Sequence, residues 1–541
     1  MSKDRPLSLL RQHAFTILFI IFSLFIIRND IVYYRSVSLR ATPDFFPAHT
    51  VGNADDYHQY IFLIKTGREG KLLYHNAYSE EPIPDVLLQP IYNVVGLLSR
   101  PFPVSLYTVY FIFHVVSLII LFVSIYLLIS RVFNPIIPKI FATILYFTAI
   151  GFWSIVSFAP FQIKRYDLAD YNFDLFSKFH VIAPHHNIAI ALVILVFIVL
   201  TSTKHHAGIV AGLLSLLLGL IHPYIQLMMF LMLFANALIQ TILERKLLTR
   251  AFRDFFIIIV ISSPLIVYYL YLTNVILHFT VATDGILTFL PRTISFLSYL
   301  QALGPLFIFA LPSLVFFIYS KPYSIIRFLL LWAFLPILLF FFPDFHLPFA
   351  VWRLSQIYQH IPLAILGAYW VYILIRNKRF ALSLMILVGG ITLLYGFTAY
   401  NYVFQASADT HDAGGYIFTY YVPTPVIHAF TYLDRETPRD SVVLASQMVS
   451  SMIPSFTHNR VIIGHNGNNR DYYQKLAEAN MFFTGTMSYD DAHAYLLKRH
   501  VSYIIFGLDM PGFTAMSYAN MGFLKLVYGN PYDISVVKVL R

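Results

Sequence analysis

Two adjacent carboxylates, Asp55 and Asp56, are the residues whose types and position best suit catalysis. They lie in the stretch NADDYHQY, beside Tyr57 and His58. A carboxylate can act as a general base, and a second one beside it can orient the first or share a divalent cation with it. A capping role is the alternative, because carboxylates favour the positive end of a helix dipole. Both interpretations require a helix that starts at this pair.

The residues after the pair predict a short amphipathic helix over 55–66, which we expect to lie on the membrane surface. Gly67 and Gly70 are typical of helix ends and predict where it stops. The side chains that define its apolar face recur at helical spacing: Tyr57, Tyr60, Ile61 and Ile64.

The composition predicts an α-helical polytopic membrane protein. Of its 541 residues, 58% are hydrophobic and 12% charged, and the mean hydropathy is +0.68, whereas soluble domains carry about 25% charged residues. No cysteine is present, which excludes disulfides, thiol nucleophiles and cysteine-ligated metals. The apolar runs predict about eleven spanning helices. Their expected ranges are 12–34, 104–130, 136–158, 182–202, 206–222, 224–243, 254–274, 298–319, 325–342, 354–375 and 380–400.

Basic residues predict the orientation in the membrane. Six short segments on one side carry 15 Lys and Arg, whereas the short turns on the other carry only Arg292 and Arg353. Because cytoplasmic loops are rich in Lys and Arg, we expect a multi-pass plasma-membrane protein with a cytoplasmic N-terminus. Residues 35–103 and 403–541 then lie outside. The net charge of +10 reflects this topology and does not indicate nucleic-acid binding.

The sequence predicts two domains and an uncleaved first helix. Residues 1–402 form the membrane domain, with the loop 35–103 carrying the aspartate pair, and residues 403–541 form an extracytoplasmic α/β domain. The first apolar segment is the least secure span, since a signal peptide is the alternative; Arg28 and Asp30, which follow its core, favour a helix that is retained. Five strands are expected in the tail, at 441–446, 460–464, 501–507, 524–528 and 534–540.

Further polar residues gather on the predicted outer face. APHHN contains His186, GLIHPY contains His222, and FFPDFHLPFAVWRLS contains His346 and Arg353. A single histidine of this kind is usually a hydrogen-bonded packing residue. A single arginine often only extends its charged end to the membrane interface. Ionisable groups at membrane depth are costly unless they serve a cavity, so together they indicate a site. His465, in the tail loop GHNGNNRDYY, is expected to face the same site, with a plain strand-to-helix connection as the alternative.

These motifs resemble the GT-C superfamily, whose members are polytopic glycosyltransferases that use polyprenyl-phosphate-linked sugars. In that superfamily the first outer loop carries a catalytic acidic residue or pair, followed by a surface helix, and NADDYHQY matches this pattern. The HPY turn and the tail from VVLASQMV to HVSYIIFG are similar to those of an uncharacterised bacterial group usually placed there. The resemblance covers most of the chain.

The resemblance implies an inverting transfer of sugar at the outer face, with a glycan, a lipid or a protein as acceptor. Asp56, or else Asp55, would be the base, and Arg353 would bind the donor phosphate. The other residues expected to contact substrate are His222, His346, His186, Tyr57, His58 and His465. Asp55 and Asp56 could hold Mg²⁺ or Mn²⁺, and the histidines of the outer face would also allow Zn²⁺ or Mn²⁺.

Two other classes of function remain open. A lipid or solute transporter is disfavoured, because the sequence has no internal repeat and few charges at helix centres. A non-catalytic membrane assembly protein is the second alternative. Substitution of the aspartate pair distinguishes an enzyme from a scaffold. An enzyme would lose turnover and keep its fold, whereas a scaffold would lose neither its role nor its fold.

Overall fold

The computed structural model divides the chain into two compact units. Unit 1 comprises residues 1–32, 114–267 and 292–409, and unit 2 comprises residues 33–113, 268–291 and 410–541. The boundaries at 32, 113 and 267 fall within helices α1 (Arg5–Leu39), α4 (Leu106–Val132) and α10 (Arg250–Val275). The described residues are 5–39, 41–49, 54–148, 179, 183–202, 206–246, 249–275, 299–300, 303–315, 325–340, 357–374, 379, 382–383, 386–390, 421–507, 522–529 and 534–540.

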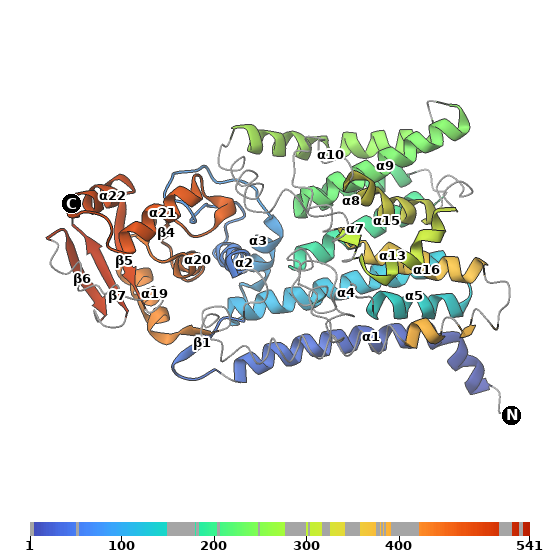
Figure 1. The fold of residues 1–541 in the computed structure, drawn as a ribbon, viewed down its shortest axis with the longest axis horizontal. Coiled ribbons are helices and arrows are strands. Elements are labelled where there is room, and N and C mark those ends of the chain that lie inside the picture. Colours follow the sequence, from blue (N-terminus) through green and yellow to red (C-terminus); the bar gives the residue numbers. More distant parts are fainter. Residues whose placement is uncertain are drawn as a thin grey trace. The chain divides into compact units, whose positions relative to one another are not determined.

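Unit 1 is built from apolar helices (Figure 1). Helix α7 packs on α8 and α9, α15 on α9 and α16, and α16 on α5 and α13. Its additional helices are α5 (Ile136–Thr148), α7 (Pro184–Leu200), α8 (Ala207–Ile221), α9 (Pro223–Glu244), α13 (Pro305–Ala310), α15 (Ile325–Phe340) and α16 (His360–Leu374), with a 3₁₀ turn at Leu311–Leu314.

Four described helices are long and apolar enough to cross a membrane. They are His13–Leu39, Leu106–Val132, Pro223–Glu244 and Arg250–Leu272. Seven further apolar helices of 10–17 residues occur in the described part of the chain. The chain is therefore a multi-pass membrane protein, and the expected number of eleven spans stays a prediction. Most of the expected last span, 380–400, lies outside the described residues.

The charges in the first apolar segment do not end its helix. Helix α1 continues through Arg28 and Asp30 to Leu39. Asp30 is 5% exposed, and its carboxylate lies 3.7 Å from Nε2 of His114, which is also buried. Arg28 donates a hydrogen bond to the side chain of Asn29. These partners lower the cost of placing ionisable groups in an apolar helix.

Helices α2 (Ala54–Arg68) and α3 (Pro90–Ser99) of unit 2 cross at unusually close range. A Cβ atom on Gly67 would lie 2.0 Å from the carbonyl oxygen of Asn93, and one on Gly96 would lie 2.0 Å from that of Ile64. Gly67 therefore serves this crossing, and the prediction that it ends the helix is wrong. Gly70, with φ of +92°, follows the helix in the left-handed region, as a C-terminal glycine does.

The tail of unit 2 contains a mixed five-stranded sheet in the order β4-β3-β5-β7-β6 (Figure 1). β3 pairs in parallel with β4 and β5, whereas β7 pairs antiparallel with β5 and β6. The strands are β3 (Val442–Leu444), β4 (Arg460–Val461), β5 (Val501–Phe506), β6 (Leu524–Gly529) and β7 (Ser535–Val539), so each predicted strand has a counterpart.

Helices of the tail complete its hydrophobic core. Phe482, Leu496 and Ile504 are among its fully buried members. The hydroxyl of Ser488 caps the last helix by accepting the N–H of Asp491, as its sequence predicts. The helices are α19 (Thr424–Glu436), α20 (Gln447–Phe456), α21 (Tyr472–Phe483) and α22 (Tyr489–Lys498). A separate antiparallel pair joins β1 (Phe45–Pro47) to β2 (Tyr421–Pro423).

Candidate active site

Helix α2 places Asp55 and Asp56 together in its first turn. The opposite face of the helix is fixed by a hydrophobic cluster in which Tyr57 and Ile61 pack with Tyr107. The two carboxylates lie inside the helix and not at the residue before it, so the N-terminal dipole stabilises both charges. The helix that the local pattern predicts is therefore present. Its residues 57–64 are all buried, so it is an interior helix, and the prediction of an amphipathic helix with one exposed face is wrong.

Helix α20 lies against α2 and brings Ser451 to the pair. At the other end of α2, the ammonium of Lys65 donates to the carbonyl oxygens of Pro454, at 3.2 Å, and Thr457. Those carbonyls belong to the C-terminal end of α20, where the negative end of the helix dipole also favours a cation. Burial lowers the pKa of Lys65 to about 8 despite nearby acidic residues. The contacts of Ser451 and Lys65 therefore fix the position of α20 along α2.

Asp56 is paired with His465, a residue 409 positions away in the sequence. Nε2 of the imidazole lies 2.9 Å from Oδ1 of Asp56, while Nδ1 accepts the backbone N–H of Gly467 at 3.0 Å. Because that N–H occupies Nδ1, the proton of the neutral ring is on Nε2 and is donated to the carboxylate. His465 thus orients Asp56 and has no nitrogen left over to act as a base.

The two partners differ in exposure. The side chain of Asp56 is 40% exposed, whereas that of His465 is 8% exposed. Burial opposes a positive charge on His465, but the hydrogen bond with Asp56 and the charges of Asp56 and Asp55 outweigh it, so the pKa of His465 is raised. The accessible group of the pair is therefore the carboxylate, and its buried partner favours the ionised form of that carboxylate.

Asp55 experiences a different environment from its neighbour. The pKa of Asp55 is raised to about 6, because burial, together with the charge of Asp56, outweighs the lowering effects of His465 and of a hydrogen bond with Ser451. Tyr78 and Tyr472 are close enough for the charge of Asp55 to raise the pKa of each, although burial is the larger cause. The raised pKa of a buried carboxyl beside a second carboxylate is a pattern typical of active sites.

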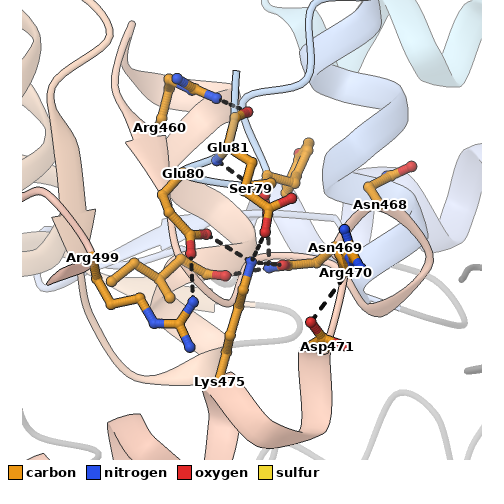
Figure 2. A network of polar contacts seen from close by, with 12 residues as sticks. Ser79, Glu80, Glu81, Arg460, Asn468, Asn469, Arg470, Asp471, Lys475 and Arg499 are labelled. Carbon is orange, nitrogen blue, oxygen red and sulfur yellow. Dashed lines mark hydrogen bonds and ion pairs between the residues drawn. The ribbon is translucent and has the colours of Figure 1, made fainter. Parts of the chain in front are cut away.

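A buried ion-pair network holds the loop that carries His465 (Figure 2). Lys475, which is fully buried, lies 2.9 Å from the carboxylate of Glu80 and 3.3 Å from that of Glu81. Its ammonium also donates to the side-chain oxygen of Asn469 at 2.8 Å. A lysine of α21 therefore ties the loop after His465 to the segment between α2 and α3 that contains Glu80.

Further contacts fix the same two segments to each other. Arg499 binds Glu80 at 3.0 Å and Glu478 at 2.6 Å, as Figure 2 shows in part. Asn469 donates to the backbone oxygens of Tyr78, at 3.1 Å, and Ile462. Gly464 permits this approach, since a Cβ atom there would lie 2.6 Å from the ring of Tyr78. The His465–Asp56 contact is thus supported by a rigid shell of polar and packing contacts.

Unit 1 holds a separate group of three histidines. His185 and His186 occupy the first turn of α7, and His222 is the residue that caps α9. The ring centroids lie 4.4 Å apart for the first two, and 5.4 and 4.5 Å from His222 for His185 and His186, respectively. His185 and His222 are buried, and His186 is half-buried.

No family model matches the sequence, and no curated protein matches it. Solved structures do. The oligosaccharyltransferase of Archaeoglobus fulgidus, in its apo form, matches with a TM-score of 0.60 at 13% identity, over 94% of this chain and 71% of the other. ArnT from Cupriavidus metallidurans, bound to undecaprenyl phosphate, matches with a TM-score of 0.52 at 11% identity, over 97% and 98%. The arabinofuranosyltransferase AftD from Mycobacteria matches with a TM-score of 0.53 at 12% identity, over 96% and 40%.

All three are glycosyltransferases of the GT-C superfamily. The chain has the GT-C fold. The resemblance that the sequence motifs indicate is therefore confirmed at the level of the fold.

The GT-C fold of this chain brings together some of the predicted site residues. Asp55, Asp56 and His465 meet in unit 2. His186 and His222 meet in unit 1. Arg353 and His346 lie outside the described residues, so their contact with a donor phosphate stays a prediction.

Tyr57 and His58 are interior residues of this GT-C chain. Tyr57 is 4% exposed and packs on the rings of Tyr107 and Tyr110. His58 is 1% exposed, its ring nitrogens have no hydrogen-bond partner among the described residues, and burial lowers its pKa to about 3. The contacts of Tyr57 are those of a core residue, and a substrate role for either side chain stays a prediction.

Ser451, Tyr78 and Lys475 were not predicted as parts of the site. Ser451 falls in a serine-rich helix whose sequence pattern predicts no partner. A lysine in a helix such as α21 is ordinarily expected at the surface. A signal does exist for Lys475, because it stands at a position that faces the core, between Tyr472 and Ala479. A lysine there predicts a buried ion pair.

Proposed function

We propose that the protein is a membrane glycosyltransferase that moves a sugar from a polyprenyl-phosphate donor to an acceptor on the outer face of the membrane. The observation that carries this proposal is the Asp55–Asp56–His465 arrangement on a chain with the GT-C fold. The fold neighbours include proteins described with undecaprenyl phosphate and with dolichol-phosphate, which supports a lipid-linked donor.

Asp56 is the proposed base. Its 40% exposure leaves the carboxylate open to an acceptor hydroxyl, and the bond from His465 orients it. In the transfer, the hydroxyl oxygen forms a bond to the anomeric carbon as the bond from that carbon to the phosphate oxygen breaks. The hydroxyl proton goes to Asp56, and polyprenyl phosphate leaves. A single displacement inverts the anomeric configuration, because no covalent sugar–enzyme intermediate forms.

Asp55 strengthens that base in the proposed mechanism. Its charge raises the proton affinity of its neighbour, and its own pKa of about 6 keeps it largely ionised near neutral pH. That same pKa makes Asp55 the alternative base, since a base works best when its pKa is near the operating pH. Single substitutions of Asp55 and of Asp56 distinguish these two roles, because only the loss of the base removes the proton acceptor.

Other groups would bind the donor. Arg353 offers a planar pair of donors for phosphate, and His222, His186 and His346 would add hydrogen bonds. The carboxylate oxygens of Asp55 and Asp56 are the ligands that Mg²⁺ or Mn²⁺ prefers, and His465 and Ser451 already bond to the pair. An ion held there would offset the negative charge of the donor phosphate.

The test is a pair of single substitutions in purified protein. Asp56→Asn should reduce the rate of transfer by about 10²–10⁴, because it keeps the shape and removes the proton acceptor. Binding of the donor lipid should persist. Asp55→Asn should reduce the rate less. Full transfer activity in Asp56→Asn would exclude Asp56 as the base, and full activity in the double variant would exclude the pair.

A further inference from the structure

The three histidines of unit 1 bring metal-ligating atoms close together. One ring nitrogen each from His185, His186 and His222 lies within 4.8 Å of the others. In a tetrahedral zinc site with Zn–N bonds of about 2.0–2.1 Å, the nitrogens lie about 3.4 Å apart. Side-chain rotations that move each ring by about an ångström would therefore close the site around an ion.

We propose that His185, His186 and His222 form a three-imidazole site for a transition-metal ion, with Zn²⁺ as the natural occupant. Imidazole nitrogen suits Zn²⁺ and neighbouring metals, whereas Mg²⁺ prefers oxygen ligands. This site is chemically distinct from the aspartate pair of unit 2. Three protein ligands leave the fourth position of a tetrahedral ion for water or an anion.

The helix ends around the cluster keep the imidazoles available for a metal. His185 and His186 lie at the N-terminus of a helix of 17 residues, and His222 caps one of 22 residues. The positive ends of helix dipoles disfavour protonated imidazole, so the neutral rings retain lone pairs. The same dipoles weakly oppose a cation, and three metal–nitrogen bonds outweigh that opposition. They also favour an anion as the fourth ligand.

Binding disturbs the N-terminal cap of α9. Nδ1 of His222 accepts the backbone N–H of Ile225 at 3.3 Å, which is the N-terminal cap of α9. If His222 binds through Nε2, its proton moves to Nδ1 and the cap is lost; if it binds through Nδ1, the metal replaces the cap. Either way the cap that is lost is a long hydrogen bond, and Pro223 at the first helical position still favours the helix start.

The cap also supplies a matched variant. Asparagine is a good N-terminal cap and lacks the imidazole, so His222→Asn keeps the helix start and removes a ligand. His186→Gln removes a half-buried ligand that does not cap its helix. His13→Asn removes an exposed histidine from the same unit and serves as the control.

The experiment measures metal binding without any sugar donor. The full-length protein in detergent is stripped with EDTA and titrated with Co²⁺ and then with Zn²⁺. The absence of cysteine leaves no thiolate signal to obscure the visible bands of the Co²⁺–imidazole site. We expect one equivalent of four-coordinate Co²⁺, displaced by Zn²⁺, and three imidazoles in the X-ray absorption of the zinc form.

The variants decide where the metal binds. His222→Asn and His186→Gln should each weaken zinc binding by at least about 100-fold, whereas His13→Asn and the Asp55→Asn/Asp56→Asn double variant should bind as the native chain does. Unchanged zinc affinity in both histidine variants, or loss of the ion in the aspartate double variant, would overturn the proposal. Zinc binding by a chain that transfers no sugar would leave this site intact and reject the proposed function alone.

Discussion

The aspartate pair of unit 2 and the histidine cluster of unit 1 are both polar groups at helix N-termini. In α2 the first turn carries Asp55 and Asp56; in α7 it carries His185 and His186. The positive end of a helix dipole stabilises a carboxylate and disfavours a protonated imidazole. The same backbone feature therefore favours charged side chains in one unit and, in the metal site that we propose, neutral imidazoles in the other.

The two sites also differ in how they are held. The histidines stand on helices that are close in sequence, and their rings contact one another directly. The aspartates depend on His465, 409 positions away, and on a buried lysine whose ion pair with Glu80 joins residues 395 positions apart. A site built from distant segments needs a dedicated framework, and the Lys475 network supplies it.

Membrane topology gives the largest expected effect, because labelling at a given site is all or none. The charge pattern places residues 35–103 outside and 244–254 inside. Leu72 is 46% exposed and Arg245 is exposed, and the chain has no native cysteine. A cysteine at Leu72 should react with an impermeant maleimide in intact cells, and one at Arg245 only after permeabilisation. The reverse pattern would place the aspartates on the cytoplasmic side.

Removal of the buried lysine is the next largest change. Lys475→Met should destabilise unit 2 by about 3 kcal/mol, because it breaks a buried ion pair, although Glu80 keeps Arg499. Hydrogen exchange in residues 74–81 and 465–475 should then accelerate by roughly 100-fold.

The control for that change is Glu81→Gln. Glu81 is 31% exposed, so its loss should cost less than about 1 kcal/mol. Equal exchange rates in Lys475→Met and the native chain would show that the network does not hold the His465 loop.

Asp55→Asn should give the smallest effect. The variant should be more stable than the native chain above pH 6.5, which is unusual for the loss of a site residue. The folded pKa of Asp55 is about 6, above its ordinary value of 3.8, so the folded chain binds more protons between these values. The contribution of Asp55 to the free energy of unfolding therefore falls as pH rises from about 4 to 6. In EDTA, the variant should melt at a higher temperature than the native chain above pH 6.5, and the gap should close toward pH 4. A gap that widens toward pH 4 would contradict the raised pKa.

Local features of the fold and site were predictable from the sequence. Apolar runs indicated the helices, alternating residues the five tail strands, and the spacing after Asp56 the helix α2. Each depends on residues within about one turn or strand of one another. His465 was predicted to face the site, with a plain strand-to-helix connection as the alternative because glycine and asparagine favour turns. The partner that it finds could not be read from that pattern.

Long-range contacts were not predictable in the same way. Gly67 resembles a helix terminator until Asn93 of α3 is seen against it. Ser451 gives no sign of its bond to Asp55, and the raised pKa of Asp55 depends on burial by segments far away in sequence. A single sequence records which groups can pair, whereas the pairing itself is decided by tertiary packing.

The most direct test of the account is the anomeric outcome of transfer by the purified native chain. Reconstituted protein is supplied with polyprenyl-phosphate-linked sugars and a cell-envelope acceptor extract, and the new glycosidic bond is assigned by NMR. We expect transfer that inverts the configuration of the donor and is lost in Asp56→Asn. A product that retains the donor configuration, or transfer that persists in Asp56→Asn, would contradict it.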